Sequence, residues 1–568
     1  MTTIVGNGSI SHFDVLVIGS GAGGGSVADV LTANGKTVLV LEAGANHFDG
    51  LDDPKKQPTT TFSNDELKLA VRGFIEPDPR VEPRTFRHAA SAGVRTFVGD
   101  VNGLPKTVGG GAAHADLKTP RFMAQDFHLG ALAKSFAGTS FADWPVDYDM
   151  LEPFYAYVES ILGVQGLEGA DPFAEPRSGG YPMPPGLPMY LALKAAEGAT
   201  ALGYHPFPYP TAVNSRPYGG RPACVDCGFC SGYGCPSNAK GSPPVTTLRR
   251  ALLTGKCQLR SETRAVRLLM NGKGNAVTGV EAIGPDGKKV TFTADRYVLA
   301  ASPIEDARLL LLSDPGGAGV GNGSGQVGRN LMFHLQNIAV GIFDERLHGH
   351  RGRTVSHGIA DFRGVAGDPK RPLGGIVEIG SAQLLISEAA SYTQLLELAG
   401  GFDGKKLRTL MRQSPLRDRL LVLTMQAEDA PQSDNRVDLD PAVKDLDALP
   451  VARVTYQNHA FELHARDHYG PKLVEILGAA GARAAFLAPK DDIPQSAHVM
   501  GTLRFGTDPK TSVCDATGRF HDVGNLYAAD GALFPTSSGF NPTLTIIALA
   551  ARVAGEMVSP GSPEQALL

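Results

Sequence analysis

The chain is poor in cysteine, with six such residues among 568. A protein of this length does not rest on a disulfide scaffold when cysteine is so scarce. A long apolar run is also lacking, since Leu309 to Leu312 sits beside Asp306 and Arg308 and nothing approaches the ~20 apolar residues that cross a bilayer. We therefore expect a globular protein without a membrane span, stabilised by a buried core.

An excess of basic residues is absent as well. Lys and Arg total 53 against 58 Asp and Glu, a net charge of -5. This balance predicts no nucleic-acid partner, because such binding needs a basic surface. The first twelve residues hold no basic region, apolar core or pair of arginines. By its own sequence the chain is expected in the cytoplasm, and in the periplasm only if a partner subunit carries it there.

Apolar residues, by contrast, are plentiful enough for a large core, at 42% of the chain. Residues 13–18 form a continuous, largely β-branched run that is typical of a buried parallel strand. A helical stretch over residues 24–34 and a second apolar run over residues 37–41 follow. This order predicts a βαβ unit and an α/β fold of two intertwined domains.

Strand-like patterns return far from this unit. They cover residues 265–269, 279–283, 290–293 and 297–301, and a helix is predicted over residues 304–312. The expected Rossmann-like sheet is therefore assembled from discontinuous segments.

A second body of sheet and helices is predicted mainly between residues 341 and 489. It should contain helices over residues 381–400 and 459–480 and a strand over residues 421–427. Two stretches rich in turn-forming residues, 51–107 and 172–222, are interpreted as long excursions and not as core elements.

Glycines fill the turn between the first strand and its helix, in the order Gly19-Ser-Gly21-Ala22-Gly-Gly24. Such glycines let backbone amides approach a pyrophosphate at the N-terminus of a helix. Glu42 ends the second strand, where a carboxylate can accept hydrogen bonds from ribose hydroxyls. The sequence therefore predicts a dinucleotide site, and this motif alone fits both FAD and NAD.

Four of the six cysteines fall within twelve residues and are followed by Pro236: Cys224, Cys227, Cys230 and Cys235. The spacing C-x2-C-x2-C-x4-C-P is close to that of thiolates that wrap an iron–sulfur cluster. A zinc ribbon usually separates its two pairs by ~15–20 residues, so zinc is the second choice.

Four blocks, in order along the chain, resemble the glucose-methanol-choline (GMC) oxidoreductase family. They are the glycine turn with Glu42, residues 108–114 with Arg121 and residues 126–127, residues 144–148, and the C-terminal third from His498 through Asp530 to Ile546. Residues 181–185 and 214–224 are similar to the catalytic subunits of bacterial FAD-dependent glucose, fructose and gluconate dehydrogenases.

The resemblance implies FAD as the cofactor. It implies further cofactor contacts from Gly109, Gly110 and Gly111 near the isoalloxazine, Asp530 and Gly531 at the ribityl-pyrophosphate, and Val266 near the adenine. His114 stands where some family oxidases attach FAD covalently. The similar sugar dehydrogenases carry histidine there without relying on such a bond, and we expect none in this chain.

Oxidation of a carbinol needs a base for the hydroxyl proton and an acceptor for the hydride. The resemblance assigns the base to His498, facing the flavin N5, and the holding of the substrate oxygen to Asn541. The expected substrate is a small alcohol, a sugar or a glycoside.

For the cysteines, the resemblance implies a three-iron cluster on Cys224, Cys230 and Cys235. Cys227 departs from that pattern and could complete a four-iron cluster, or the loop could be free of metal. With a cluster, electrons would pass to a cytochrome or another acceptor, and a small subunit is a further expected partner. Without one, the enzyme could be an oxygen-reducing oxidase of a pyranose or glycoside. A lyase of the hydroxynitrile type is the more distant alternative.

The expected organisation has five segments. They are a first FAD-binding segment (1–130), a connecting segment on the substrate side (131–220), the cysteine-rich loop with a second FAD-binding segment (221–340), the substrate-binding domain (341–490) and a third FAD-binding segment with the catalytic residues (491–568).

Overall fold

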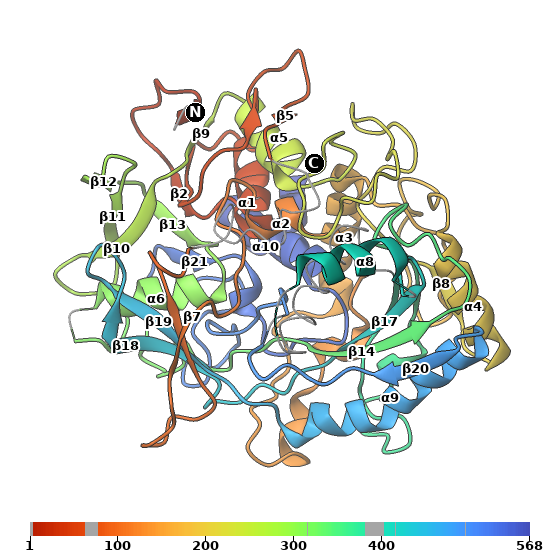
Figure 1. Ribbon diagram of the computed structural model, residues 1–568. Helices are drawn as coiled ribbons and strands as arrows, with labels where there is room; N and C mark the ends of the chain where they lie inside the picture. Colours follow the sequence, from red (N-terminus) through yellow and green to blue (C-terminus); the bar gives the residue numbers. More distant parts are fainter. Residues whose placement is uncertain are drawn as a thin grey trace.

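A computed structural model of the protein describes residues 4–567, apart from residues 63–77, 315, 381–400, 402, 415 and 495. A six-stranded sheet forms one half of the molecule (Figure 1). Its strand order is β1 (Ile4–Gly6), β9 (Cys257–Arg260), β3 (Val38–Leu41), β2 (Val15–Ile18), β13 (Arg296–Leu299) and β21 (Leu526–Ala528). Only β1, at the edge, is antiparallel to its neighbour. The strands come from three distant parts of the chain, which confirms a sheet assembled from discontinuous segments.

Helices flank this sheet because its central strands are apolar on both faces. Every residue of β2 and β3 is buried. Helix α1 (Ala22–Ala33) packs against α10 (Thr543–Val558) and α5 (Thr247–Leu253), and α3 (Tyr148–Leu162) packs against α10. The predicted βαβ unit is thus confirmed, with α1 beginning two residues earlier than expected.

Three predicted strands form a separate sheet of their own. They are β10 (Arg264–Met270), β11 (Val277–Ile283) and β12 (Lys289–Phe292), which pair antiparallel. Their alternation of buried and exposed residues suits a sheet with one face in water, not the buried parallel sheet. Helix α6 (Pro303–Ser313) packs on β10, close to its predicted bounds.

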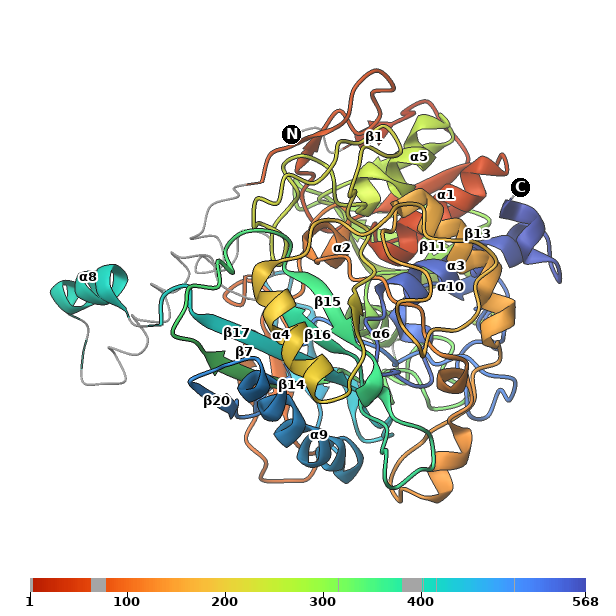
Figure 2. The ribbon, with the colours of Figure 1, turned by 90° about the vertical axis from the view of Figure 1, so that its right-hand side faces the viewer.

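A second six-stranded sheet, fully antiparallel, forms the other half. Its order is β20 (Ala484–Leu487), β14 (Leu335–Ile342), β17 (Leu420–Ala427), β16 (Val377–Gly380), β15 (Val355–Ile359) and β8 (Pro206–Pro208). Helices α9 (Ala460–Ala479) and α4 (Tyr190–Ala201) lie along this sheet (Figure 2). The predicted strand 421–427 and helix 459–480 are confirmed, while the predicted helix 381–400 lies outside the described residues.

Both predicted excursions contain core elements, so that interpretation is corrected. Residues 172–222 include α4, whose buried Leu191, Ala192 and Ala195 follow a Pro-rich lead-in that hides their helical spacing. Residues 51–107 supply β6 (Arg84–Arg87) and β7 (Phe97–Gly99) to a four-stranded sheet with β18 (Arg436–Lys444) and β19 (Pro450–Thr455). Strands β18 and β19 contact α6, which also packs on β10. Part of segment 341–490 therefore lies beside the second FAD-binding segment and not only in the second six-stranded sheet.

The remaining α-helices and strands of the described residues are short. They are α2 (Gly110–His114), α8 (Gly404–Gln413), β4 (Phe48–Asp49) and β5 (Thr59–Thr60). Short 3-10 helices lie in the connections, at Ala124–Phe127, Gly130–Lys134, Pro243–Val245, Asp361–Arg363, Gly531–Leu533 and Pro563–Leu567. Across the part of the chain that the structure describes, no helix combines the length and apolar character that a membrane span requires.

Candidate active site

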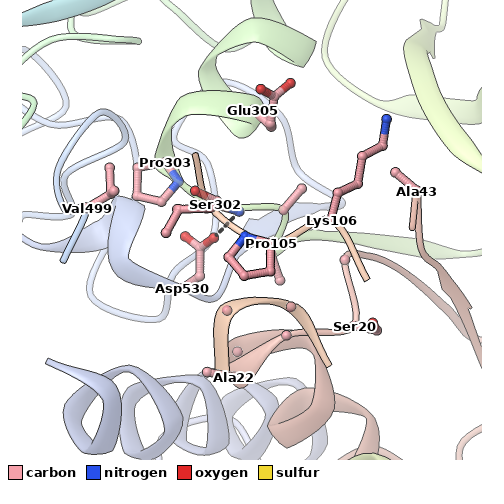
Figure 3. Close-up of a pocket in the computed structure, with 18 of the residues that line it drawn as sticks. Ser20, Ala22, Ala43, Pro105, Lys106, Ser302, Pro303, Glu305, Val499 and Asp530 are labelled. Carbon is pink, nitrogen blue, oxygen red and sulfur yellow. Dashed lines mark hydrogen bonds between the residues drawn. The ribbon is translucent and has the colours of Figure 1, made fainter. Parts of the chain in front are cut away.

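A cavity of about 540 Å³ opens at the carboxyl ends of β2, β3 and β13 (Figure 3). Most of the predicted site residues line it: Gly19, Gly21, Ala22, Glu42, Gly110, Gly111, His114, Val266, His498, Asp530 and Gly531. Three others, Gly24, Gly109 and Asn541, pack against or bond to residues of this wall. The structure therefore gathers the predicted dinucleotide residues and the predicted base around one space.

Two glycines of the first turn are required by close backbone contacts. Gly19 has φ +103°, and a Cβ there would lie 2.2 Å from the carbonyl oxygen of Ala300. A Cβ on Gly24 would lie 2.0 Å from the carbonyl oxygen of Gly19. Only glycine lets α1 begin this close to the strands, with its N-terminal amides toward the cavity.

Two buried carboxylates mark opposite parts of the cavity wall. Glu42 Oε2 accepts hydrogen bonds from the backbone N–H (3.1 Å) and the hydroxyl (2.6 Å) of Ser20, and Oε1 accepts one from the Gly44 N–H (2.8 Å). Asp530 Oδ2 accepts a hydrogen bond from the Ser302 N–H at 2.8 Å (Figure 3). Burial raises the pKa of both carboxyl groups. The hydrogen bonds from backbone N–H groups hold both carboxyl groups beside the space that a dinucleotide would fill.

The predicted catalytic pair is in direct contact. Asn541 Nδ2 lies 3.3 Å from Nε2 of His498. On the other side of the ring, His498 Nδ1 lies 2.9 Å from Nδ1 of His334, whose Nε2 lies 2.9 Å from the carbonyl oxygen of Ser538. His334 begins the run into β14 and was not predicted; a lone histidine before a strand gives no local signal of such a contact.

Both imidazoles are held neutral by their surroundings. Burial lowers the pKa of His334 to about 4. Burial, together with His334 and the positive charge of Lys118, holds the pKa of His498 well below its usual value of 6.5. A neutral imidazole is the form that can accept a proton, which is the form that the predicted base role of His498 requires.

A second layer of side chains fixes Asn541. The Tyr209 hydroxyl donates to Asn541 Oδ1, and Asn541 Nδ2 donates to Glu378 Oε1 at 2.8 Å. Glu378 in turn accepts from Lys118 Nζ at 2.6 Å. Sequence reasoning missed these groups, although Glu378 stands out as a single carboxylate within the buried strand β16.

The predicted metal site at the cysteine loop finds no support in the structure. No group of three or more Cys, His, Asp or Glu side chains suited to a metal ion occurs in the described ranges, which include all four cysteines: Cys224, Cys227, Cys230 and Cys235. The loop is instead held by Lys240, whose ammonium donates to the backbone carbonyls of Ala115 (2.7 Å), Cys230 (3.2 Å) and Tyr233 (2.8 Å). The iron–sulfur and zinc predictions are therefore not supported by the described residues.

His114 lies at the junction between this loop and the cavity. Its ring packs edge-on against Phe62 with centroids 4.5 Å apart, and its carbonyl oxygen accepts from the Gly232 N–H at 2.9 Å. Ser231 and Gly232 also line the cavity, so the cysteine loop closes the end of the space next to His114.

Comparison with known proteins agrees with this geometry. Two family models, both described as GMC oxidoreductase, match residues 194–336 and 431–550. The chain is 30% identical to 2-methyl-1,2-propanediol dehydrogenase of Mycolicibacterium austroafricanum over 97% of this chain and 96% of that protein. The chain belongs to the GMC oxidoreductase family.

Further members of this GMC family carry sugar-related names. Paromamine 6'-oxidase of Streptomyces fradiae is 31% identical over 96% of this chain and 92% of its own length. The gluconate 2-dehydrogenase flavoprotein of Pantoea cypripedii is 28% identical over 95% of this chain and 92% of its own length.

Among solved structures, pyridoxine 4-oxidase from Mesorbium loti matches with a TM-score of 0.63 and 18% identity, covering 96% of this chain and 98% of that one. The expected family and its sugar dehydrogenase relatives are thus confirmed.

We predict that Gly24→Ala destabilises this GMC protein, because the added methyl group meets the Gly19 carbonyl oxygen at the start of α1. Overpacking of this kind costs about 1–3 kcal/mol. Thermal unfolding should therefore occur at a lower temperature than in the unchanged protein.

The matched control is Gly478→Ala near the end of α9, where a Cβ meets nothing within 4 Å. Alanine is the better helix former by up to about 1 kcal/mol, so this variant should unfold at the same or a higher temperature. Equal unfolding temperatures for the two variants would refute the close contact at Gly24.

Proposed function

We propose that this chain is an FAD-dependent enzyme that oxidises a CH–OH group of a sugar, glycoside or related polyol, with His498 as the base. The observation that carries the proposal is the His498–Asn541 pair at the wall of a cavity with a dinucleotide-type glycine turn. The substrate class is supported by relatives named for a diol, an amino sugar and gluconate.

The residues around the cavity fit FAD. A Cβ on Gly111 would meet nothing within 4 Å, so its backbone faces open space. The proposed contacts are Gly19, Gly21 and Ala22 for the pyrophosphate, Glu42 for the ribose, Val266 for the adenine, Asp530 and Gly531 for the ribityl-pyrophosphate, and Gly110, Gly111 and His114 for the ring system. When bound, FAD supplies the acceptor for the hydride of the alcohol.

Hydrogen bonds assign the proton positions on the two histidines. The Ser538 carbonyl oxygen can only accept, so His334 Nε2 carries a proton and, in the neutral ring, His334 Nδ1 is an acceptor. His498 Nδ1 must then donate to it, so His498 Nε2 is unprotonated; its lone pair faces Asn541 Nδ2 at 3.3 Å and can accept a substrate proton. The two hydrogen bonds that run from the Ser538 carbonyl through His334 to His498 form a relay. This relay favours the tautomer of His498 with Nε2 unprotonated, which a base requires.

Asn541 is oriented in the same way. Because Tyr209 donates to its oxygen and Glu378 accepts from its nitrogen, the amide cannot flip, and its second N–H points toward His498. A carbinol oxygen placed between them donates its proton to His498 Nε2 and accepts a hydrogen bond from Asn541. That bond strengthens as negative charge grows on the oxygen.

The final acceptor of the electrons divides the proposal into two variants. In the first variant, electrons pass to an external carrier, for which a cytochrome is proposed together with a small partner subunit, and this chain is a dehydrogenase. In the second, dioxygen accepts the electrons and the chain is an oxidase.

To test the function, the purified holoenzyme is mixed with sugars and diols without oxygen, and the visible flavin band is followed. Loss of the band with any of these alcohols supports the proposal, and no loss with the whole panel overturns it. Subsequent addition of air or of an artificial one-electron acceptor then distinguishes oxidase from dehydrogenase.

Replacement of the proposed base should abolish this reaction without loss of the cofactor. We expect His498→Ala to slow flavin reduction by about 100-fold or more, since that is the usual contribution of a positioned base. Stopped-flow absorbance without oxygen measures the rate, and the flavin spectrum of the variant reports cofactor content. A variant with bound flavin and an unchanged rate would rule out His498 as the base.

The pH dependence follows from the lowered pKa of His498. A depressed pKa means that the ring stays neutral until the solution is more acidic than about pH 6.5. Flavin reduction should therefore be constant from about pH 8 to about pH 6.5 and decline only below that range. A decline that begins above neutral pH would contradict the neutral imidazole.

His334 should act by positioning the base. We expect His334→Leu, which cannot accept a hydrogen bond, to lower kcat by about 10–100-fold with little change in KM. His334→Gln keeps an acceptor and should recover part of the loss. Equal kcat values for both variants and the unchanged enzyme would exclude the relay, and a steeper loss of rate in acid for His334→Leu would support it.

A further inference from the structure

A buried ion cluster lies directly behind the catalytic pair, and it is formed by Lys118, Asp116 and Glu378. Lys118 Nζ lies 2.6 Å from Glu378 Oε2 and 3.1 Å from Asp116 Oδ2. Lys118 and Asp116 follow α2, and Glu378 lies on β16, so the cluster joins the two halves of the molecule. Its members expose only 15% (Lys118), 10% (Asp116) and 5% (Glu378) of their side chains.

The cluster is coupled to the proposed reaction centre. Glu378 Oε1 accepts from Asn541 Nδ2 at 2.8 Å, so one residue separates the ion pair from the position of the carbinol oxygen. The Lys118 charge also contributes to the low pKa of His498, which places the ammonium within electrostatic reach of that ring. Ala115, the residue before Asp116, lines the cavity together with His498, so the cluster adjoins the wall of the space proposed for the substrate.

The cluster has hydrogen-bonding capacity left over. An ammonium has three N–H donors, and the two carboxylates account for two of those on Lys118. Asp116 Oδ1 is buried and has no hydrogen-bond partner among the residues that the structure describes. Because both oxygens of Asp116 share one carbon, this acceptor lies beside the spare donor of Lys118. A donor next to an acceptor is the arrangement that suits a hydroxyl group, which donates and accepts at one atom.

We propose that Lys118 and Asp116 form a subsite for a second hydroxyl group of the substrate, on the carbon next to the carbinol. The subsite rests on the proposed function and narrows it, since the enzyme would then prefer vicinal diols and sugars over alcohols with a single hydroxyl. Glu378 holds Lys118 in place and connects the subsite to Asn541. An unpaired polar group left in the subsite penalises a substrate that lacks the second hydroxyl.

The test compares 1,2-propanediol with 1-propanol on the holoenzyme, because the two alcohols share a carbon skeleton and a primary carbinol. The ratio of their kcat/KM values for flavin reduction without oxygen is expected to favour the diol by about tenfold or more. Lys118→Met retains the length of the side chain and removes its donors, and it should lower this ratio to within about threefold of unity, mainly through KM of the diol.

Matched variants separate recognition from general damage. Lys194 lies on α4 and forms an ion pair of 3.0 Å with Glu345. Lys194→Met breaks this pair, which shares no residue with the cluster, and should keep the ratio of the unchanged enzyme. Asp116→Asn keeps the shape and should lower the ratio in the same direction as Lys118→Met. If Lys118→Met does not bind flavin, Lys118→Arg replaces it, because arginine keeps the charge between the carboxylates and moves the donors.

The outcomes distinguish failure of the subsite from failure of the proposed function. A ratio near unity in the unchanged enzyme, or an undiminished ratio in Lys118→Met and Asp116→Asn, overturns the subsite while flavin reduction still supports the proposed function. A preference for 2-amino-1-propanol over 1,2-propanediol would also overturn it, in favour of an ammonium site at the two carboxylates. Failure of every alcohol to reduce the flavin overturns the proposed function itself.

Discussion

The site depends on the close approach of the Gly19 backbone to the carbonyl oxygen of Ala300, which leaves no room for a side chain at Gly19. It brings the turn after β2 against the end of β13, so that the cavity opens at the shared carboxyl edge of the sheet. Beyond β13, the Ser302 N–H fixes Asp530. The Gly531 carbonyl oxygen then accepts from the Gly501 N–H at 3.0 Å, which anchors the loop that carries His498. A chain of backbone contacts therefore transmits the geometry of the first turn to the proposed base.

Burial imposes a second constraint, because polar groups at the centre must find partners within the protein. His334 is 3% exposed and Asn541 2%, and each is oriented by an oxygen that can only accept: the Ser538 carbonyl for His334 and the Glu378 carboxylate for Asn541. A backbone carbonyl directs the histidines, while a tyrosine hydroxyl and a carboxylate direct the amide. The same pairing that makes burial tolerable therefore leaves one lone pair, on His498 Nε2, without a strong partner. The hydrogen bonds that stabilise the buried polar groups are thus the same ones that set the tautomer of His498, the proposed base.

Sequence patterns predicted what is local and failed where distant segments meet. The runs at 13–18 and 37–41, the glycines between them and Glu42 form one continuous signal, so the βαβ unit could be identified and the proposed dinucleotide residues could be placed on it. His498 and Asn541 were identified through the family resemblance. Lys118, Glu378 and His334 belong to segments up to 260 residues apart along the chain and carry no spacing that links them. Their joint role becomes visible only when β14, β16 and α2 are placed together.

The cysteine loop shows how little spacing alone determines. Closely spaced thiols lie near one another along the chain, but metal binding also needs them to converge on one point, and the interaction that the structure shows in this loop is between backbone carbonyls and Lys240. A buried ammonium with three carbonyl partners satisfies oxygens that the irregular loop would otherwise leave unpaired, although burial lowers the pKa of Lys240. Since Gly232 of this loop bonds to His114 and borders the cavity, the order that Lys240 imposes extends to the cavity wall. The loop thus shapes the proposed flavin site through its backbone.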